Sequence, residues 1–238
     1  MSILNDTVLE SNKYLKLNFN GGDLSSDAGL LLIKEFAYKL GFVDILKKEF
    51  KTNDSASFRF HKDDENLWQV IYQILGAYFE DDCADELTND PVLTAILSKK
   101  VLESQPTLSR FFNRMDESTL NQFYALMRRF RKVVYSGKKP EMLLLDLDST
   151  LLNTYGHQEG EGFNFHYQNR GYHPLVCYDG ITGDLLKIEL RNGTDYSSTG
   201  VTEFLQPLLD EFGAEYPDIP LLLRGDSGFT KPGTLSSM

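Results

Sequence analysis

Two aspartates in the second half of the chain could hold a divalent cation. Asp148 follows an apolar run that begins at Met142, and Asp226 follows a second apolar run that begins at Ile219. Asp146 lies two residues before Asp148, so both side chains fall on the same face of a strand. Carboxylate oxygens at the rim of a sheet are suitable ligands for a hard cation. The two runs therefore predict a metal site where two strands end.

The alternative for each aspartate is a purely structural role. An aspartate directly after a strand commonly forms a turn or caps the next helix. For either run alone this is the more frequent arrangement. The presence of two such runs, and the elements between them, favours the metal site.

The order of elements after residue 140 indicates a mixed α/β core. Five of the six residues from 142 to 147 are apolar, which is typical of a central strand covered on both faces. A segment rich in glycine and polar residues follows at 151–166. The pattern then predicts a hairpin of strands 172–178 and 185–190, a helix over 199–212 that ends at Gly213, and a strand that ends at Asp226.

The first half of the chain is predicted to be mainly helical. Apolar residues recur at helical spacing in most of its segments. We expect a short strand at 15–19, a helix that begins near Ser25 or Ser26, and helices at 43–50, 67–78, 91–97, 104–111 and 120–134. Lys138, Lys139 and Pro140 are typical of a linker, so residues 1–140 and 141–238 are predicted to form separate parts.

Charge is distributed unevenly along the chain. The net charge is -11, and residues 141–238 contribute -10 of it, so most of the excess acid accompanies the predicted metal site. Residues 99–139 instead carry 10 basic and 3 acidic side chains. A short helix followed by a basic helix, with apolar residues at 120, 123, 127, 130 and 134, could contact a phosphate backbone. Cations on a solvated helix face are the open alternative. The candidate DNA-binding residues are Arg110, Arg114, Arg128, Arg129, Arg131 and Lys132.

Several other classes of protein are disfavoured. No segment approaches the roughly 18 apolar residues of a membrane span, so no membrane partner is expected. The first residues lack the basic and apolar regions of a secretory signal. Cys83 and Cys177 lie far apart in no metal-binding spacing, which indicates reduced thiols in a cytoplasmic protein.

Four ordered blocks resemble one group of DDE-type transposases of bacterial insertion sequences, which have a ribonuclease-H-like catalytic core. The resemblance extends from about Leu15 to Phe229. The blocks are SQPTLSR (104–110), LDLDST (145–150), GHQEG (156–160) with FN (163–164), and LLRGDSGF (222–229).

The resemblance implies a function and a set of site residues. Asp148 matches the family's first catalytic acid and Asp226 its second, while Asp146 is an auxiliary candidate. The implied chemistry is DNA strand cleavage and strand transfer with two Mg²⁺ or Mn²⁺ ions, with carboxyl groups roughly 4 to 7 Å apart. The implied partners are the inverted-repeat ends of the element, target DNA and further copies of the chain on DNA in the bacterial cytoplasm, associated with the nucleoid when bound. Three further residues, His157, Glu159 and Arg224, lie in matching blocks. Loop contacts are expected for His157 and Glu159, with an auxiliary metal or DNA contact as the open alternative, and phosphate contact or a carboxylate partner is expected for Arg224.

The sequence departs from the family pattern after Asp226. The family's third catalytic acid, a Glu on a later helix, has no counterpart before Met238, and residues 230–238 contain no acid. We therefore expect a ribonuclease-H-like core that is truncated and inactive alone. A non-catalytic DNA-binding remnant or regulator of transposition, and a metal-dependent nuclease or phosphatase, are the alternative functions.

Overall fold

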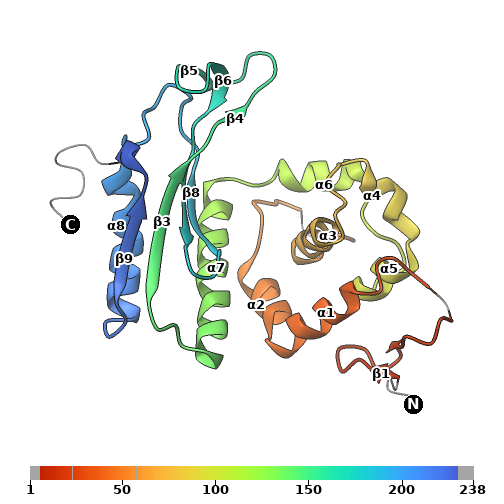
Figure 1. Cartoon of the computed structure of the whole chain (residues 1–238). Helices are drawn as coiled ribbons and strands as arrows, with labels where there is room; N and C mark the ends of the chain where they lie inside the picture. Colours follow the sequence, from red (N-terminus) through yellow and green to blue (C-terminus); the bar gives the residue numbers. More distant parts are fainter. Residues whose placement is uncertain (1–5, 23, 57, 230–238) are drawn as a thin grey trace. The chain divides into compact units, whose positions relative to one another are not determined.

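The computed structural model describes residues 6–22, 24–56 and 58–229, and the chain forms two compact units. The first unit comprises residues 1–133 and the second residues 134–238. The division falls within helix α7 (Glu117–Gly137), ahead of the linker expected at 138–140. Each unit has its own hydrophobic core. Figure 1 labels most of their elements.

The first unit is mainly helical, as the apolar spacing predicted. A two-stranded sheet, β1 (Thr7–Val8) with β2 (Lys16–Leu17), precedes the helices. The helices are α1 (Leu30–Lys39), α2 (Phe42–Glu49), α3 (Asp63–Leu75), α4 (Cys83–Glu86), the 3₁₀ turn η1 (Leu87–Asn89), α5 (Pro91–Leu97) and α6 (Gln105–Phe112), followed by α7. The start of α1 differs from the expected Ser25 or Ser26, because the backbone at Asp27 and Ala28 forms turns instead.

Large apolar side chains from α2, α3, α5 and α6 close the first core. Phe50 and Phe111 are fully buried, with ring centroids 6.1 Å apart. Phe123 of α7 packs against Phe50 with the ring centroids 5.3 Å apart. Burying large side chains of this kind contributes roughly 1.5 to 3 kcal/mol each. The core therefore fixes α6 and the first part of α7 against the earlier helices.

The buried face of helix α7 differs from the face that the sequence predicted. Leu120 and Val134, assigned to its apolar face, are each 47% exposed. Leu126, which the expected stripe omitted, is buried, and so is Arg131. The spacing was correctly identified as helical, but tertiary contacts around Phe123, Leu126 and Phe130 decide which face is covered.

The second unit is built on a four-stranded mixed sheet. Its strands are β3 (Leu143–Ser149), β7 (Leu175–Asp179), β8 (Leu185–Glu189) and β9 (Leu221–Gly225), in the order β8-β7-β3-β9. β3 pairs antiparallel with β7 and parallel with β9. Helix α8 (Val201–Glu215) connects β8 to β9. This mixed α/β arrangement, three strands, a helix and a parallel fourth strand, is that of a ribonuclease-H-like core.

Helix α8 covers one face of this sheet and lies beside β9 in Figure 1. Its buried Phe204, Leu208 and Phe212 share a core with the odd-numbered residues of β3. The even-numbered residues of β3 are half-buried or exposed, so the expectation of a strand covered on both faces was wrong. The helix also continues through Gly213, because Tyr216 still donates its backbone N–H to the carbonyl of Phe212.

A second, three-stranded sheet lies within the segment expected only to be polar and glycine-rich. It comprises β4 (Leu152–Asn153), β5 (Gly162–Asn164) and β6 (Asn169–Tyr172), in the order β4-β6-β5. The single strand expected at 172–178 is therefore two strands in different sheets. At Gly171 the backbones approach so closely that a Cβ would lie 2.1 Å from the carbonyl oxygen of Leu152. A last 3₁₀ turn, η2 (Ser227–Phe229), follows β9.

Candidate active site

The register between β3 and β9 brings the two candidate acids to the same rim of the sheet. Leu147 pairs with Gly225 in this parallel ladder. Asp148 is the next residue of β3 and Asp226 directly follows β9, so an extension of this register by one residue sets them side by side. Neighbouring strands lie about 4.8 Å apart. Both side chains belong to exposed residues, as a site for a polymeric substrate requires.

Backbone amides orient both carboxylates. The Asp148 carboxylate accepts a hydrogen bond of 2.7 Å from the N–H of Ser149. The Asp226 carboxylate accepts one of 2.8 Å from the N–H of Gly228, within the turn η2. Asp226 therefore also performs the turn-capping role that was the alternative for it. One oxygen of each carboxylate has no hydrogen-bond donor or cation among the described residues.

A serine pair ties a third segment to this rim. The hydroxyls of Ser149 and Ser197 lie 2.9 Å apart. Gly228 packs closely against Ser197 and Asp226. A Cβ on Gly228 would lie 3.3 Å from the Cβ of Ser197 and 2.9 Å from Oδ1 of Asp226. A side chain at Gly228 would therefore push on the carboxylate of Asp226. The segment before α8 thus becomes part of the site.

Arg191 holds the segment that carries Ser197. Its buried guanidinium donates hydrogen bonds to the carbonyl oxygens of His173, Tyr196 and Thr199 at 2.9, 3.1 and 2.6 Å. Burial lowers the pKa of Arg191 from its usual value. Three backbone carbonyls bound by one side chain fix the loop between β8 and α8. Arg191 therefore stabilises the loop that carries Ser197 and, through this loop, the rim.

Asp146 is engaged in a different way from the other two acids. Its carboxylate receives two hydrogen bonds from the guanidinium of Arg224, at 2.9 and 2.5 Å, across the β3–β9 pair. This guanidinium holds the pKa of Asp146 below its usual range. Both oxygens of Asp146 are thus committed to Arg224. Of the two roles considered for Arg224, the structure displays the carboxylate partner.

The donor set at the rim fits a hard divalent cation. Asp148 and Asp226 supply oxygen ligands, and Mg²⁺ is commonly bound through one or two carboxylates together with water and substrate phosphates. Within residues 6–22, 24–56 and 58–229 no group of three or more His, Cys, Asp or Glu side chains forms a metal cluster. The rim therefore offers the two candidate aspartates and no larger cluster among these residues.

His157 and Glu159 lie on the loop before β5. The imidazole of His157 is 94% exposed and lies 3.6 Å from the carboxylate of Glu161. The Glu159 carbonyl accepts a hydrogen bond of 2.6 Å from the hydroxyl of Tyr172. Both contacts are of the loop type that was expected. Glu161, which the sequence analysis did not single out, is the centre of the cluster because Thr154 and Arg170 also bind its carboxylate.

The six candidate DNA-binding cations occupy different environments. Arg110, Arg128, Arg129 and Lys132 are exposed. Arg131 is only 7% exposed, so it does not offer the surface guanidinium that the expectation assumed. DNA contact by the exposed four stays a prediction.

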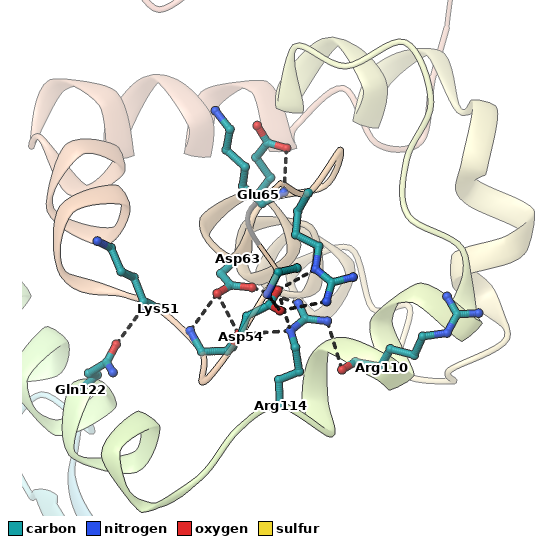
Figure 2. Close-up of polar contacts among 11 residues, drawn as sticks. Lys51, Asp54, Asp63, Glu65, Arg110, Arg114 and Gln122 are labelled. Carbon is teal, nitrogen blue, oxygen red and sulfur yellow. Dashed lines mark hydrogen bonds and ion pairs between the residues drawn. The ribbon is translucent and has the colours of Figure 1, made fainter.

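Arg114 is bound within the helical unit, as Figure 2 shows. Its guanidinium forms an ion pair of 2.9 Å with Asp63 and lies 3.5 Å from the carboxylate of Asp54. Asp54 in turn binds Arg59 through two hydrogen bonds, at 2.6 and 2.8 Å. These contacts join the start of α3 to the end of α6. Arg114 therefore has a structural role that its position in the sequence did not indicate.

Sequence reasoning missed the residues that complete the rim. Ser149 and Gly228 lay inside two of the recognised blocks, yet they were given no role. Ser197 and Arg191 carried no local signal at all. Their contribution depends on contacts between distant segments; the two serines, for example, lie 48 residues apart in the sequence.

Comparisons with known proteins were made for the whole sequence. The family model described as "Transposase DDE domain group 1" matches residues 8–238. Searches of curated proteins and of solved structures found no match. Among the described helices, none has the length and apolar character needed to cross a membrane.

Proposed function

Because the chain belongs to the family of group 1 transposase DDE domains, we propose that it cleaves and joins DNA strands by metal-dependent phosphoryl transfer at Asp148 and Asp226. The observation that carries this proposal is the β3–β9 register. It supports two carboxylates from separate strands acting on one reacting phosphate. The family relationship supports DNA transposition as the process.

The proposal assigns distinct tasks to the acids. Asp148 and Asp226 hold Mg²⁺ or Mn²⁺, with two ions as the expected number. When bound, such ions activate the attacking oxygen and stabilise the leaving oxygen. Gly228 and Ser149 orient the carboxylates through their backbone N–H groups. The Asp146–Arg224 pair joins the two strands two residues before Asp148 and Asp226. This structural role replaces the auxiliary metal role considered for Asp146.

DNA is the proposed partner of both units. The ends of a bacterial insertion sequence and its target are the proposed substrates, and several copies of the chain act together on them. The exposed Arg128, Arg129 and Lys132 support a DNA-contacting role for the helical unit. The proposed site of action is the bacterial cytoplasm, at the nucleoid.

A second candidate function is DNA binding without turnover. It is favoured by one observation, that no group of three or more potential metal ligands is present among the described residues. A regulator of transposition would retain the DNA contacts and lack cleavage. Cleavage by the wild-type chain separates the two functions.

Metal binding and cleavage test the main proposal together. We expect the protein to bind Mn²⁺, measured by titration with detection of free Mn²⁺ by electron paramagnetic resonance. Cleavage is assayed on DNA that carries the ends of its element, and cleavage by this chain alone would contradict the expectation that it is inactive alone. Asp148→Asn and Asp226→Asn should each weaken Mn²⁺ binding and reduce cleavage by about a thousandfold or more, because residues that act as a unit fail together. The control is Asp218→Asn, which removes an exposed carboxylate at the other end of β9.

The outcomes distinguish the alternatives. Mn²⁺ binding that is unchanged in both aspartate variants would overturn the site. Mn²⁺ binding and DNA binding without cleavage by the wild-type protein would support the regulatory function. Cleavage of any phosphodiester or phosphomonoester, without preference for element ends, would support a nuclease or phosphatase.

A further inference from the structure

A small pocket in the helical unit is built from residues that the candidate active site does not use. It has a volume of about 220 Å³. Its lining comes from the segment before α3, from the first turn of α3, from α6 and from the residues just after α6, all of which belong to the unit of residues 1–133. The pocket is lined by Arg59, Phe60, His61, Asn66, Thr107, Arg110 and Arg114.

One wall of the pocket is held rigid by ion pairs. Arg59 and Arg114 both contact Asp54, and Arg114 also binds Asp63 (Figure 2). Their positive charges are therefore compensated locally. These two arginines shape the pocket and hold its loop in place, and they leave the recognition of a ligand to other residues.

Arg110 provides an available cation at this pocket. Its guanidinium has no hydrogen-bond or ion-pair partner in the described part of the chain, and Figure 2 shows it directed away from the Asp54 and Asp63 carboxylates. Thr107 precedes it by three residues on α6, so the two side chains lie on the same face of the helix. A guanidinium and a hydroxyl on one face are suited to bind a phosphate group.

Asn66 and Phe60 add features that a phosphate alone does not require. Asn66 is 1% exposed, and its side-chain oxygen is buried without a hydrogen-bond partner among the described residues. A buried acceptor of this kind costs free energy until a donor reaches it. Phe60 is 75% exposed and packs edge-on against His61. An exposed aromatic ring is a surface on which a nucleobase can stack.

We propose that this pocket binds one unpaired nucleotide of a DNA strand. The phosphate contacts Arg110 and Thr107, the base stacks on Phe60, and an N–H group of the base donates to Asn66. The volume lies below the range typical of sites for larger ligands, which limits the pocket to a single base. This inference rests on DNA being the partner of the chain, and it adds a place where a strand is held away from its complement.

Binding measurements without metal test the pocket separately from cleavage. Fluorescence anisotropy would compare a labelled single-stranded oligonucleotide, the blunt duplex of the same sequence, and a single strand with abasic sites, all in EDTA. The wild-type protein should bind the single strand more tightly than the abasic strand. Phe60→Ala should weaken binding of the single strand about 5- to 150-fold, the range for loss of one stacked base.

Two further variants examine the polar contacts. Arg110→Ala should weaken binding of both single strands and reduce the salt slope by about one, because one phosphate contact is lost. Asn66→Leu should weaken binding of the intact strand and leave the abasic strand unaffected. The matched controls are Phe79→Ala and Lys48→Ala, which remove an exposed ring and an exposed cation elsewhere in the same unit. Circular dichroism would verify that each variant is folded.

The outcomes separate this inference from the proposed function. Absence of binding to every DNA would overturn both. DNA binding that is equal in the wild type, Phe60→Ala and Arg110→Ala would overturn the pocket alone. Equal losses in the pocket variants and the controls would also overturn it, because they would indicate a diffuse charged or apolar surface.

Discussion

The guanidinium of Arg224 binds the carboxylate of Asp146 across two parallel neighbouring strands, directly before those strands deliver Asp148 and Asp226. The pair joins β3 to β9 through side chains as well as through the backbone ladder. The strand β9 lies at the edge of its sheet, and its Leu222 is half-exposed. An added cross-strand contact there stabilises the register on which the candidate site depends.

Asp146→Asn should reduce thermal stability in a pH-dependent way. Arg224 lowers the pKa of Asp146 in the folded state, so the stabilisation is present above the unfolded-state pKa of about 3.9 and is lost as the pH falls through the folded-state value. At pH 7 the variant should unfold about 5 °C lower or less, as expected for a partly exposed pair. Thermal unfolding followed by circular dichroism from pH 7 down to pH 3 measures the difference. A difference that stays constant over this range would contradict the assignment.

Replacement of Arg128, Arg129 and Lys132 by Ala should weaken DNA binding and flatten its dependence on salt. Each phosphate contact contributes about 0.9 to the slope of log K against log salt for duplex DNA. A loss of up to about three contacts is therefore expected. The control triple variant replaces Lys13, Lys16 and Lys48, which are exposed in the same unit. If both triple variants behave alike, the cations of α7 are only a solvated face.

Arg114→Ala should affect the stability of the helical unit more than its contact with DNA. The side chain binds Asp63 and lies beside Asp54, and both carboxylates would lose a partner. The expected loss is about 1 to 3 kcal/mol in the free energy of unfolding, measured by urea denaturation. Arg110→Ala is the matched comparison, because that guanidinium has no ion-pair partner among the described residues. A larger loss of stability in Arg110→Ala would contradict this distinction.

Gly228→Ala should disturb the candidate metal site without removing a ligand. The new Cβ would approach Oδ1 of Asp226 to 2.9 Å, so the carboxylate or the turn η2 must shift. Mn²⁺ binding should weaken, while the thermal midpoint changes by only a few degrees, about the effect of 1 kcal/mol or less. Gly213→Ala serves as the control, since no atom lies within 4 Å of a Cβ there. Unchanged Mn²⁺ affinity in Gly228→Ala would remove Gly228 from the site.

Local chemistry determined which segments of this chain become helices and strands. Helix α5 has the bounds that the sequence predicted, because Asp90 caps it through the N–H groups of Val92 and Leu93 and Pro91 occupies its first turn. The apolar runs before Asp148 and Asp226 likewise became the strands β3 and β9. Caps, proline and apolar spacing act within a few residues, so they can be read along the sequence.

Only the tertiary structure decided which of these segments meet and which side chains they cover. The register of β3 with β9, which sets Asp148 beside Asp226, depends on how α8 returns the chain to the sheet. The pairing of Arg114 with Asp63 joins residues 51 positions apart. The burial of Arg131 and the exposure of Leu120 depend on packing of the whole helix. Such contacts are selected by the free energy of the complete fold, in which many residues of distant segments act together, and no local pattern encodes them.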